Sequence, residues 1–312
     1  MTDVTDRIVA VTGATDGIGR AMVHRLAAAG ATTIVHGRSA QRVDDTIAEI
    51  RAAQPAATLF GYVADFASLA AVRAFAETLA TDFPRIDVLI NNAGIGSGGR
   101  GGAREISADG YELRFAVNFL APFLLTGLTL PLARESSAAR IVNVASIGQA
   151  PLDFEDVMLE HGYDGGRAYS QSKLALITFT FALAERLRSA GIENVTANVL
   201  HPSSLMPTKM VFESFGYTLS TLEAGVEATL RLAVAPALAG VSGRYYDVLR
   251  EDRAQSQAYD EGARERLWSL AERLCGFAYL SSKTASTVVP PVQGPAPLGA
   301  VTQSMANSDT PV

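Results

Sequence analysis

The amino-acid sequence predicts an α/β fold in which a single parallel β-sheet is covered by helices on both faces. Apolar runs of strand length alternate with helical patterns up to about residue 250, and this alternation is typical of parallel strands joined by right-handed crossovers. The strand runs are almost continuously apolar, as in residues 87–90, which indicates a sheet buried from both sides. With 312 residues, 48% of them hydrophobic, the chain can bury a large core as one domain.

The predicted elements follow one another in a regular order. Gly30 ends the first helix, and Ser39 and Ser68 stand where caps of the next two helices fall. Residues 281–312 are rich in Ser, Thr, Pro, Gly and Ala, so we expect a flexible tail after a domain of residues 1–280. The expected strands are residues 8–11, 32–35, 58–63, 87–90, 140–144, 195–200 and 244–248, and the helices include residues 21–29, 40–53, 69–81, 111–133 and 169–190.

Charge and cysteine content argue against several classes of protein. The net charge of -6 disfavours nucleic acid as a partner, because neutralising phosphates needs clustered Lys and Arg. Cys275 is the single cysteine, so no internal disulfide forms and a reducing compartment is expected. The first residues carry no signal-peptide pattern. We therefore expect a soluble, cytoplasmic protein.

Residues 115–133 form the one stretch long and apolar enough to suggest a membrane span. The stretch contains Asn118, Pro122 and Pro131, and it lies between two strand patterns. We interpret it as a buried core helix and expect no membrane span.

The first predicted strand ends in a glycine-rich turn that leads directly into a helix. A dinucleotide pyrophosphate can approach such a turn because no Cβ intervenes, and the helix amino terminus offers unpaired amides and a positive dipole end. A lone glycine cluster also marks ordinary turns, but this placement favours a dinucleotide site of a Rossmann-type, doubly wound fold. The candidate cofactor-binding residues in this turn are Gly13, Thr15, Asp16, Gly17, Ile18 and Gly19.

The end of the second strand distinguishes between the two nicotinamide cofactors. An acidic residue there binds the adenosine ribose hydroxyls, whereas a basic residue accepts a 2′-phosphate. Here His36 and Gly37 are followed by Arg38 and Ser39, with no acid at the strand end. This charge pattern favours NADP(H) over NAD(H), with Arg38 as phosphate ligand and Ser39 as hydrogen-bond donor. The alternative is that Arg38 is only a solvated surface residue.

Tyr169 and Lys173 are spaced so that both side chains lie on one face of a helix. An ammonium group near a phenol stabilises the phenolate, which would lower the tyrosine pKa toward neutral pH. Such a tyrosine can act as general acid in a reduction and as general base in an oxidation. The same pair of residues is also common as a plain surface contact.

Over about residues 6–250 the chain resembles the short-chain dehydrogenase/reductase family. The resemblance rests on five motifs in the expected order. They are the turn 12–19, the segment 91–94, Asn118, Ser146, and Tyr169 with Lys173.

The resemblance implies an oxidoreductase that moves a hydride between nicotinamide and a carbonyl or alcohol. It assigns substrate positioning to Ser146, proton transfer to Tyr169, ribose binding to Lys173 and a water relay to Asn118. Asn118 could instead be a satisfied buried amide, and Ser146 could simply cap a turn.

The resemblance also implies further cofactor contacts. Asp65 matches the residue that contacts adenine, and Asn92, Ala93 and Gly94 match the segment beside the cofactor. After the sixth strand the usual Pro-Gly is Pro202-Ser203 here, and the carboxamide-binding threonine is displaced to Thr208. The long acidic loop before Tyr169 is similar to that of the retinol-dehydrogenase-like branch, which includes many bacterial carbonyl reductases.

Residues 203–222 contain an apolar set that suits a lid over a bulky apolar or aromatic ketone, aldehyde or alcohol. The same residues could equally pack a helix onto the core. The histidines are scattered, without a metal-ligand spacing, and hydride transfer needs no metal. The lid's apolar set is Leu205, Met206, Met210, Val211, Phe212, Phe215 and Tyr217.

Two other functions remain open on the same fold. A non-catalytic nucleotide sensor would typically lose Tyr169 or Lys173, whereas an epimerase or dehydratase would typically carry a larger carboxy-terminal domain. The resemblance also implies a possible homo-oligomer, formed through the apolar helices around residues 115–133 and 174–184.

Overall fold

The computed structural model describes residues 4–98, 102–209, 211–212 and 216–279, and the expected tail of residues 281–312 lies outside them. Its centre is one sheet in the order β3-β2-β1-β4-β5-β6-β7-β8. All neighbouring strands are parallel except β7 and β8, which pair antiparallel at the edge. The strands are β1 Ile8–Val11, β2 Thr32–Gly37, β3 Leu59–Val63, β4 Val88–Asn91, β5 Ala139–Val144, β6 Val195–His201, β7 Tyr245–Asp247 and β8 Arg250–Asp252.

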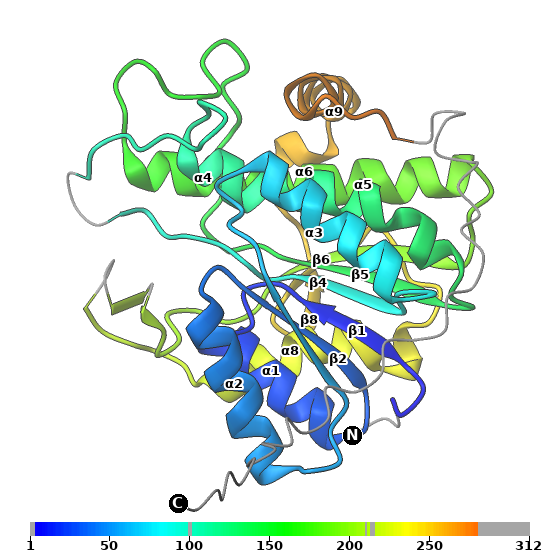
Figure 1. Ribbon diagram of the computed structural model, residues 1–312. Helices are drawn as coiled ribbons and strands as arrows, with labels where there is room; N and C mark the ends of the chain where they lie inside the picture. Colours follow the sequence, from blue (N-terminus) through cyan, green and yellow to red (C-terminus); the bar gives the residue numbers. More distant parts are fainter. Residues whose placement is uncertain (1–3, 99–101, 210, 213–215, 280–312) are drawn as a thin grey trace, which may run out of the picture.

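The sheet lies between two layers of helices, which confirms the predicted doubly wound α/β fold (Figure 1). One layer holds α1 Gly17–Ala28, α2 Ala40–Ala53 and α8 Leu222–Val234. The other holds α3 Leu69–Asp82, α4 Leu113–Phe115, α5 Ala121–Arg134 and α6 Gly165–Ser189, with α9 Glu261–Cys275 outermost. A short 3₁₀ turn, η2 Pro236–Leu238, follows α8, and another, η3 Ser256–Tyr259, follows β8.

Strand side chains enter the two cores alternately, because successive residues of a strand point to opposite faces of the sheet. Val9 and Val11 of β1 belong to the core shared with α1 and α8, whereas Ile8 and Ala10 belong to the core shared with α3, α5 and α6. All four are buried, as expected for a central parallel strand.

The helix expected over residues 111–133 is interrupted. The structure has α4, then a π-helical turn η1 Ala116–Leu120, then α5, and Asn118 within this turn bonds to the segment after β4. By length and composition, the helix Leu113–Arg134 could cross a membrane, with a mean hydropathy of 1.7, but 83% of its apolar window is buried inside the protein. It is packed as the core helix we expected.

The carboxy-terminal helix α9 covers the outer side of α6 and was not among the expected helices. Trp268 on α9 packs edge-on against Phe123 of α5, with ring centroids 5.4 Å apart, and it also contacts Phe179 of α6. The guanidinium of Arg186 lies 4.0 Å from the centre of the Trp268 ring. The outward faces of the two helices expected to self-associate are therefore partly covered by the chain itself.

Candidate active site

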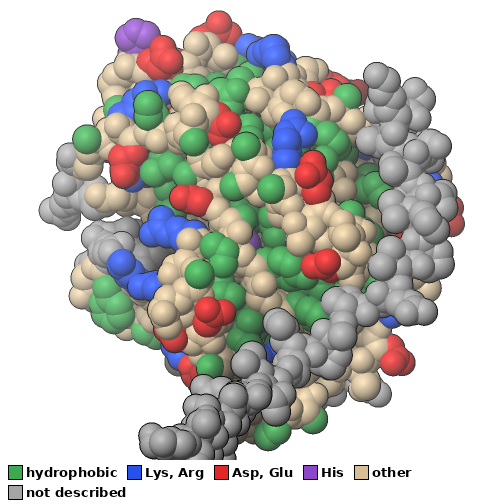
Figure 2. Space-filling model, viewed as in Figure 1, with side chains coloured by type: hydrophobic (Ala, Val, Ile, Leu, Met, Phe, Trp, Pro, Cys, Tyr) green, Lys and Arg blue, Asp and Glu red, His purple; other side chains and the backbone are tan. Residues whose placement is uncertain are grey.

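The candidate site residues lie at the carboxyl ends of the parallel strands, where ligands bind in open α/β sheets. The loops that follow β4, β5 and β6 extend to the left of the view in Figure 1. Figure 2, in the same view, shows blue Lys and Arg side chains next to green apolar ones on that side of the molecule. Red Asp and Glu side chains lie among them, so this side of the molecule combines apolar surface with charges of both signs.

The glycine-rich turn between β1 and α1 is locked to the segment after β4. The side-chain amide of Asn92 donates to the carbonyls of Thr12 (2.9 Å) and Gly13 (3.0 Å). Gly13 has a φ of +64°, and a Cβ there would lie 2.8 Å from Cα of Ala93. The turn thus needs glycine both for its backbone conformation and for this close approach.

The amino terminus of α1 lies next to the segment that follows β6. Asp16 is its N-cap, and its carboxylate accepts from the N–H of Gly17 at 2.7 Å. Gly17 has a φ of +50°, and a Cβ there would lie 3.2 Å from Cγ2 of Thr208. Thr208, from the segment after β6, therefore lies against the turn. Ile18 and Gly19 are buried behind it.

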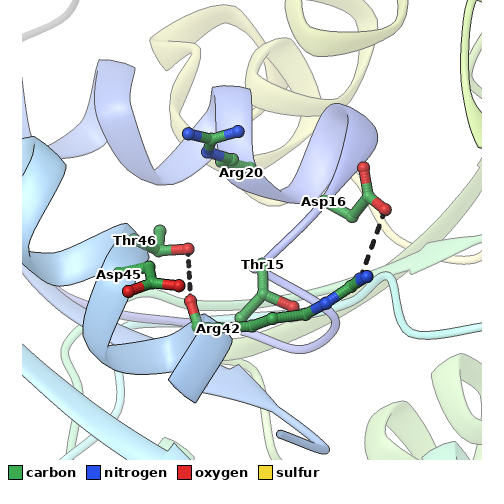
Figure 3. A pocket seen from close by; sticks show the side chains of 6 residues that line it. All are labelled: Thr15, Asp16, Arg20, Arg42, Asp45 and Thr46. Carbon is green, nitrogen blue, oxygen red and sulfur yellow. Dashed lines mark hydrogen bonds and ion pairs between the residues drawn. The ribbon is translucent and has the colours of Figure 1, made fainter. Parts of the chain in front are cut away.

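A pocket of about 290 Å³ lies between the start of α1 and α2 (Figure 3). The Arg42 side chain runs across it, and its Nη1 lies 3.6 Å from a carboxylate oxygen of Asp16. Arg38 is exposed just before α2, and Ser39 is the N-cap of α2 but makes no side-chain cap bond. The glycine-rich motif indicates Thr15 and Asp16, whereas no local pattern marks the two arginines, which α2 and α1 contribute. The lining residues are Thr15, Asp16, Arg20, Arg42, Asp45 and Thr46.

Asp65 follows β3, and the family resemblance implies that this residue contacts adenine. It is exposed, and its carboxylate accepts from the N–H of Ala67 at 2.9 Å. One residue earlier, the carbonyl of Ala64 binds Nε2 of His36, whose other ring nitrogen accepts from the turn at Gly13. In the sequence, His36 is only one of four scattered histidines.

Lys173 is buried at the other end of the site. Its Nζ donates to the carbonyl of Val144 at 2.9 Å, and burial lowers the pKa of the amine from 10.5 to about 8. A Cβ on Gly94 would lie 3.4 Å from this nitrogen and 3.2 Å from Oδ1 of Asn118. The structure therefore brings Gly94, Asn118 and Lys173 together, three residues that the family resemblance assigns to the site.

Asn118 is fully buried, and its side chain has hydrogen-bond partners. Its Oδ1 accepts from the N–H of Ile95 at 2.8 Å, and its Nδ2 donates to the carbonyl of Ile95 (3.1 Å) and to Oγ of Ser172 (3.0 Å). This geometry agrees with a satisfied buried amide. It also agrees with a role in the site, because the same hydrogen bonds hold the loop beside Lys173.

Tyr169 shares a side-chain hydrogen bond with Ser146, and Nζ of Lys173 lies 5.8 Å from the centre of its ring. Loss of solvation raises the pKa of the phenol above 10.0, and the bond to Ser146 offsets only part of this. The expected lowering by the ammonium group is therefore not found in the protein alone. Tyr169 is protonated at neutral pH and can donate a proton.

A second set of contacts, which the sequence did not reveal, supports Ser146. The side-chain amide of Gln149 donates to the Ser146 carbonyl and to the hydroxyl of Tyr245 on β7, both at 3.1 Å. The Oγ of Ser146 accepts from the N–H of Gly148 at 3.0 Å. The serine is thereby held facing Tyr169.

The segment of residues 203–222 shows features of both expected roles, a lid over the substrate and packing onto the core. Met206 is buried against Gly225 of α8, which is core packing, whereas Phe212 and Tyr217 are more than half exposed. Pro202 is buried at the end of β6, and Leu205 has a φ of +47°. Met210 and Phe215 lie outside the described residues.

This set of side chains fits an extended dinucleotide. Arginines stand at one end, a helix amino terminus lies in the middle, and Ser146, Tyr169 and Lys173 lie at the other end. Within the part of the chain that the structure describes, no group of three or more His, Cys, Asp or Glu side chains could hold a metal ion.

Comparison with known proteins gives matches along most of the chain. The model of the short chain dehydrogenase family matches residues 7–215. Retinol dehydrogenase 14 of Mus musculus is 36% identical over 296 residues, covering 87% of this chain and 86% of that protein. Polyprenol dehydrogenase of Homo sapiens is 32% identical over 287 residues, covering 87% of this chain and 86% of that protein.

Solved structures also align with most of the chain. An uncharacterized protein from Mycobacterium Paratuberculosis aligns with a TM-score of 0.72 at 28% identity, covering 88% of this chain and 95% of that one. A short chain dehydrogenase from Escherichia coli CFT073, complexed with NADPH, aligns with a TM-score of 0.64 at 25% identity. The alignment covers 80% of this chain and 98% of that one.

Proposed function

The chain belongs to the short chain dehydrogenase family, in its retinol-dehydrogenase-like branch, and we propose that it uses NADP(H) to interconvert apolar or aromatic carbonyl compounds and alcohols. As a member of this family it is an NAD(P)-dependent dehydrogenase that acts on CH–OH or C=O groups. The choice of NADP(H) and the apolar character of the substrate are the proposal.

The charges around the start of α2 support NADP(H). Arg38 is exposed at the end of β2, no acid stands at that strand end, and Arg42 reaches into the neighbouring pocket. Planar guanidinium groups suit a phosphate, whereas the ribose hydroxyls of NAD(H) need an acid. Asp16 and Asp45 line the same pocket, and their negative charges disfavour a bound phosphate. The strength of the preference for NADP(H) therefore depends on whether Arg42 pairs with Asp16 or with the phosphate.

The surface around the catalytic end supports an apolar substrate. Ile147, which follows the serine, is 56% exposed, and Phe212, Tyr217 and Leu219 of the segment after β6 are 54%, 55% and 71% exposed. These exposed apolar side chains lie on the segments that follow β5 and β6, at the end of the sheet where ligands bind, and they suit an apolar ligand. Two of the relatives are named for retinol and polyprenol, which are apolar alcohols.

When bound, the nicotinamide ring supplies or accepts the hydride. In reduction, Ser146 and Tyr169 hydrogen-bond the substrate oxygen, and Tyr169 donates its phenolic proton as negative charge develops there. Lys173 is charged below a pH of about 8, and it would bind the nicotinamide ribose, the role that the family resemblance gives it. In oxidation the same phenol would take the proton back as the general base.

The observation that carries the proposal is the contact of Tyr169 with Ser146 beside the buried Lys173. The test is a steady-state assay of apolar ketones, aldehydes and alcohols against small charged hydroxy acids, with NADPH and NADH in parallel. We expect turnover of the apolar set with NADPH preferred. Preference for charged hydroxy acids would contradict the substrate class, and preference for NADH would contradict the cofactor.

Two alternatives on the same fold are separated by that assay. A nucleotide sensor would bind the cofactor without turnover, and an epimerase or dehydratase would change substrate without net oxidation of NADPH. Tyr169, Ser146 and Lys173 are together in the site, which favours a dehydrogenase over a sensor.

Location and assembly complete the proposal. We propose a cytoplasmic protein, which fractionation of cells would test. Self-association through the region of α5 and α6 would have to include α9, because α9 covers part of that face. Light scattering on the purified chain and on a variant altered on α9 would test this.

A further inference from the structure

A buried ion pair lies beneath the loop that follows β4, outside the residues so far assigned to catalysis. Glu112 and Arg114 are 1% and 2% exposed, although charged side chains are seldom buried so completely. The atoms Nη1 of Arg114 and Oε1 of Glu112 are 3.5 Å apart. Burying these charges costs free energy. The hydrogen bonds that each side chain forms must offset this cost.

Arg114 holds the loop itself. Its Nε donates to the carbonyl of Gly96 at 3.1 Å, and its Nη2 donates to Glu105 at 2.9 Å. Gly98 has a φ of +83°, and a Cβ there would collide with Nη2 of Arg114. The loop from Gly94 to Gly98 is thus folded over the guanidinium group.

Glu112 joins two helix beginnings. One carboxylate oxygen caps α4 by accepting from the N–H of Phe115 at 2.7 Å. The other accepts from the hydroxyl of Tyr163 at 3.1 Å, just before α6 begins. Because α4 leads into the π-helical turn with Asn118, and α6 carries Tyr169 and Lys173, this carboxylate ties together both helices that bring catalytic groups to the site.

The loop also touches the catalytic helix directly. A Cβ on Gly165, in the first turn of α6, would collide with the carbonyl oxygen of Ser97. At its other end the loop carries Ile95, whose N–H and carbonyl both bond to Asn118. A shift of the loop would therefore move Ile95 relative to Asn118 and Gly94 relative to Lys173.

We propose that Glu112 and Arg114 are positioning residues for hydride transfer: they set the loop from Gly94 to Gly98 against Asn118 and Lys173. The inference rests on the proposed function and deepens it. Displacing reacting groups by a fraction of an ångström can cost a large factor in rate, so loss of either residue lowers kcat more than it lowers cofactor binding.

The test uses Glu112→Gln and Arg114→Met, each with a matched control. Both control residues lie at the amino ends of the strands, at the opposite end of the sheet from the site. Asp87→Asn also converts a buried carboxylate that binds a backbone N–H, that of Ile8 at 2.8 Å. Arg140→Met also removes a buried arginine that donates to backbone carbonyls, those of Leu232 and Ala235. These controls report the effect of a comparable loss of buried polar contacts away from the site.

Three quantities are measured for each variant at a temperature where it is folded: kcat with NADPH, the Kd of NADPH, and hydrogen exchange at the amide of Ile95. We expect kcat to fall about 10- to 100-fold in both cluster variants, with the Kd changed less than about threefold. We also expect exchange at Ile95 to be about tenfold faster. Both controls should keep kcat and Ile95 exchange near wild type.

The inference is overturned if kcat and Ile95 exchange in Glu112→Gln and Arg114→Met change no more than in their controls. A wild-type chain that binds NADPH but turns over no carbonyl or alcohol would instead refute the proposed function. In that case exchange at Ile95 still decides whether the buried pair positions the loop.

Discussion

The backbone N–H of Gly13 donates to Nδ1 of His36 at 3.2 Å, which ties the glycine-rich turn to the end of β2. The Nε2–H of the same ring donates to the carbonyl of Ala64 at 3.0 Å, and the ring stacks on Phe66 with centroids 4.3 Å apart. These bonds require the neutral imidazole with its proton on Nε2. Burial favours that form and lowers the pKa of His36 to about 4.

This ring should make the fold sensitive to acid. Between pH 6.5 and about 4 the unfolded chain binds a proton on His36 that the folded chain does not, so stability falls as the pH falls through this window. His36→Phe leaves two backbone groups unpaired and is less stable at pH 7, by about 1–3 kcal/mol for each group. The gap between variant and wild type should shrink by up to about 3 kcal/mol near pH 4. Urea unfolding across this range checks it, and a gap that does not change with pH would contradict it.

Arg38→Asp should weaken the binding of NADPH by about tenfold or more relative to NADH, because an acid repels the 2′-phosphate and accepts from ribose hydroxyls. Fluorescence titration with both cofactors measures the ratio. Arg134→Asp, at the exposed end of α5, is the control for a change of surface charge. If Arg38→Asp leaves the ratio at its wild-type value, Arg38 is only a surface residue.

Asp16→Asn should strengthen NADPH binding by about two- to fivefold, the range expected for an exposed ion pair. Asparagine still caps α1, so the turn is kept, while Arg42 loses the carboxylate 3.6 Å away. The gain should diminish at high salt and be absent with NADH. Weaker NADPH binding would show that Asp16 assists the cofactor.

Trp268→Ala should lower the free energy of unfolding by about 3–5 kcal/mol, the usual cost of removing a buried aromatic side chain. Trp268 is 5% exposed and contacts Phe123, Phe179 and Tyr279. Denaturation measures the loss. A loss below about 1 kcal/mol would mean that α9 is only loosely held against α5 and α6.

The sheet could be predicted because its signals are local, whereas most candidate site positions depend on the family resemblance. Apolar runs mark buried strands, glycines mark the turn after β1, and the spacing of Tyr169 and Lys173 puts them on one helical face. Parallel topology then brings the strand ends to one edge, which gathers residues that are far apart in sequence.

The remaining features depend on tertiary contacts that no local pattern contains. The π-helical turn at Asn118 accompanies its two bonds to Ile95, and the role of His36 depends on Gly13 and Ala64. The raised pKa of Tyr169 arises from how tightly the folded chain excludes water around it, whereas sequence spacing indicates only its distance from Lys173.

The central claim is that the phenolic proton of Tyr169 is transferred to or from the substrate oxygen. The most direct measurement is kcat and the NADPH Kd of Tyr169→Phe beside wild type, with thermal unfolding to confirm that both are folded. We predict that kcat falls by about 10²- to 10⁴-fold while the Kd stays within about threefold, because the ring remains and only the proton donor is lost. Turnover at the wild-type rate in Tyr169→Phe would contradict the account.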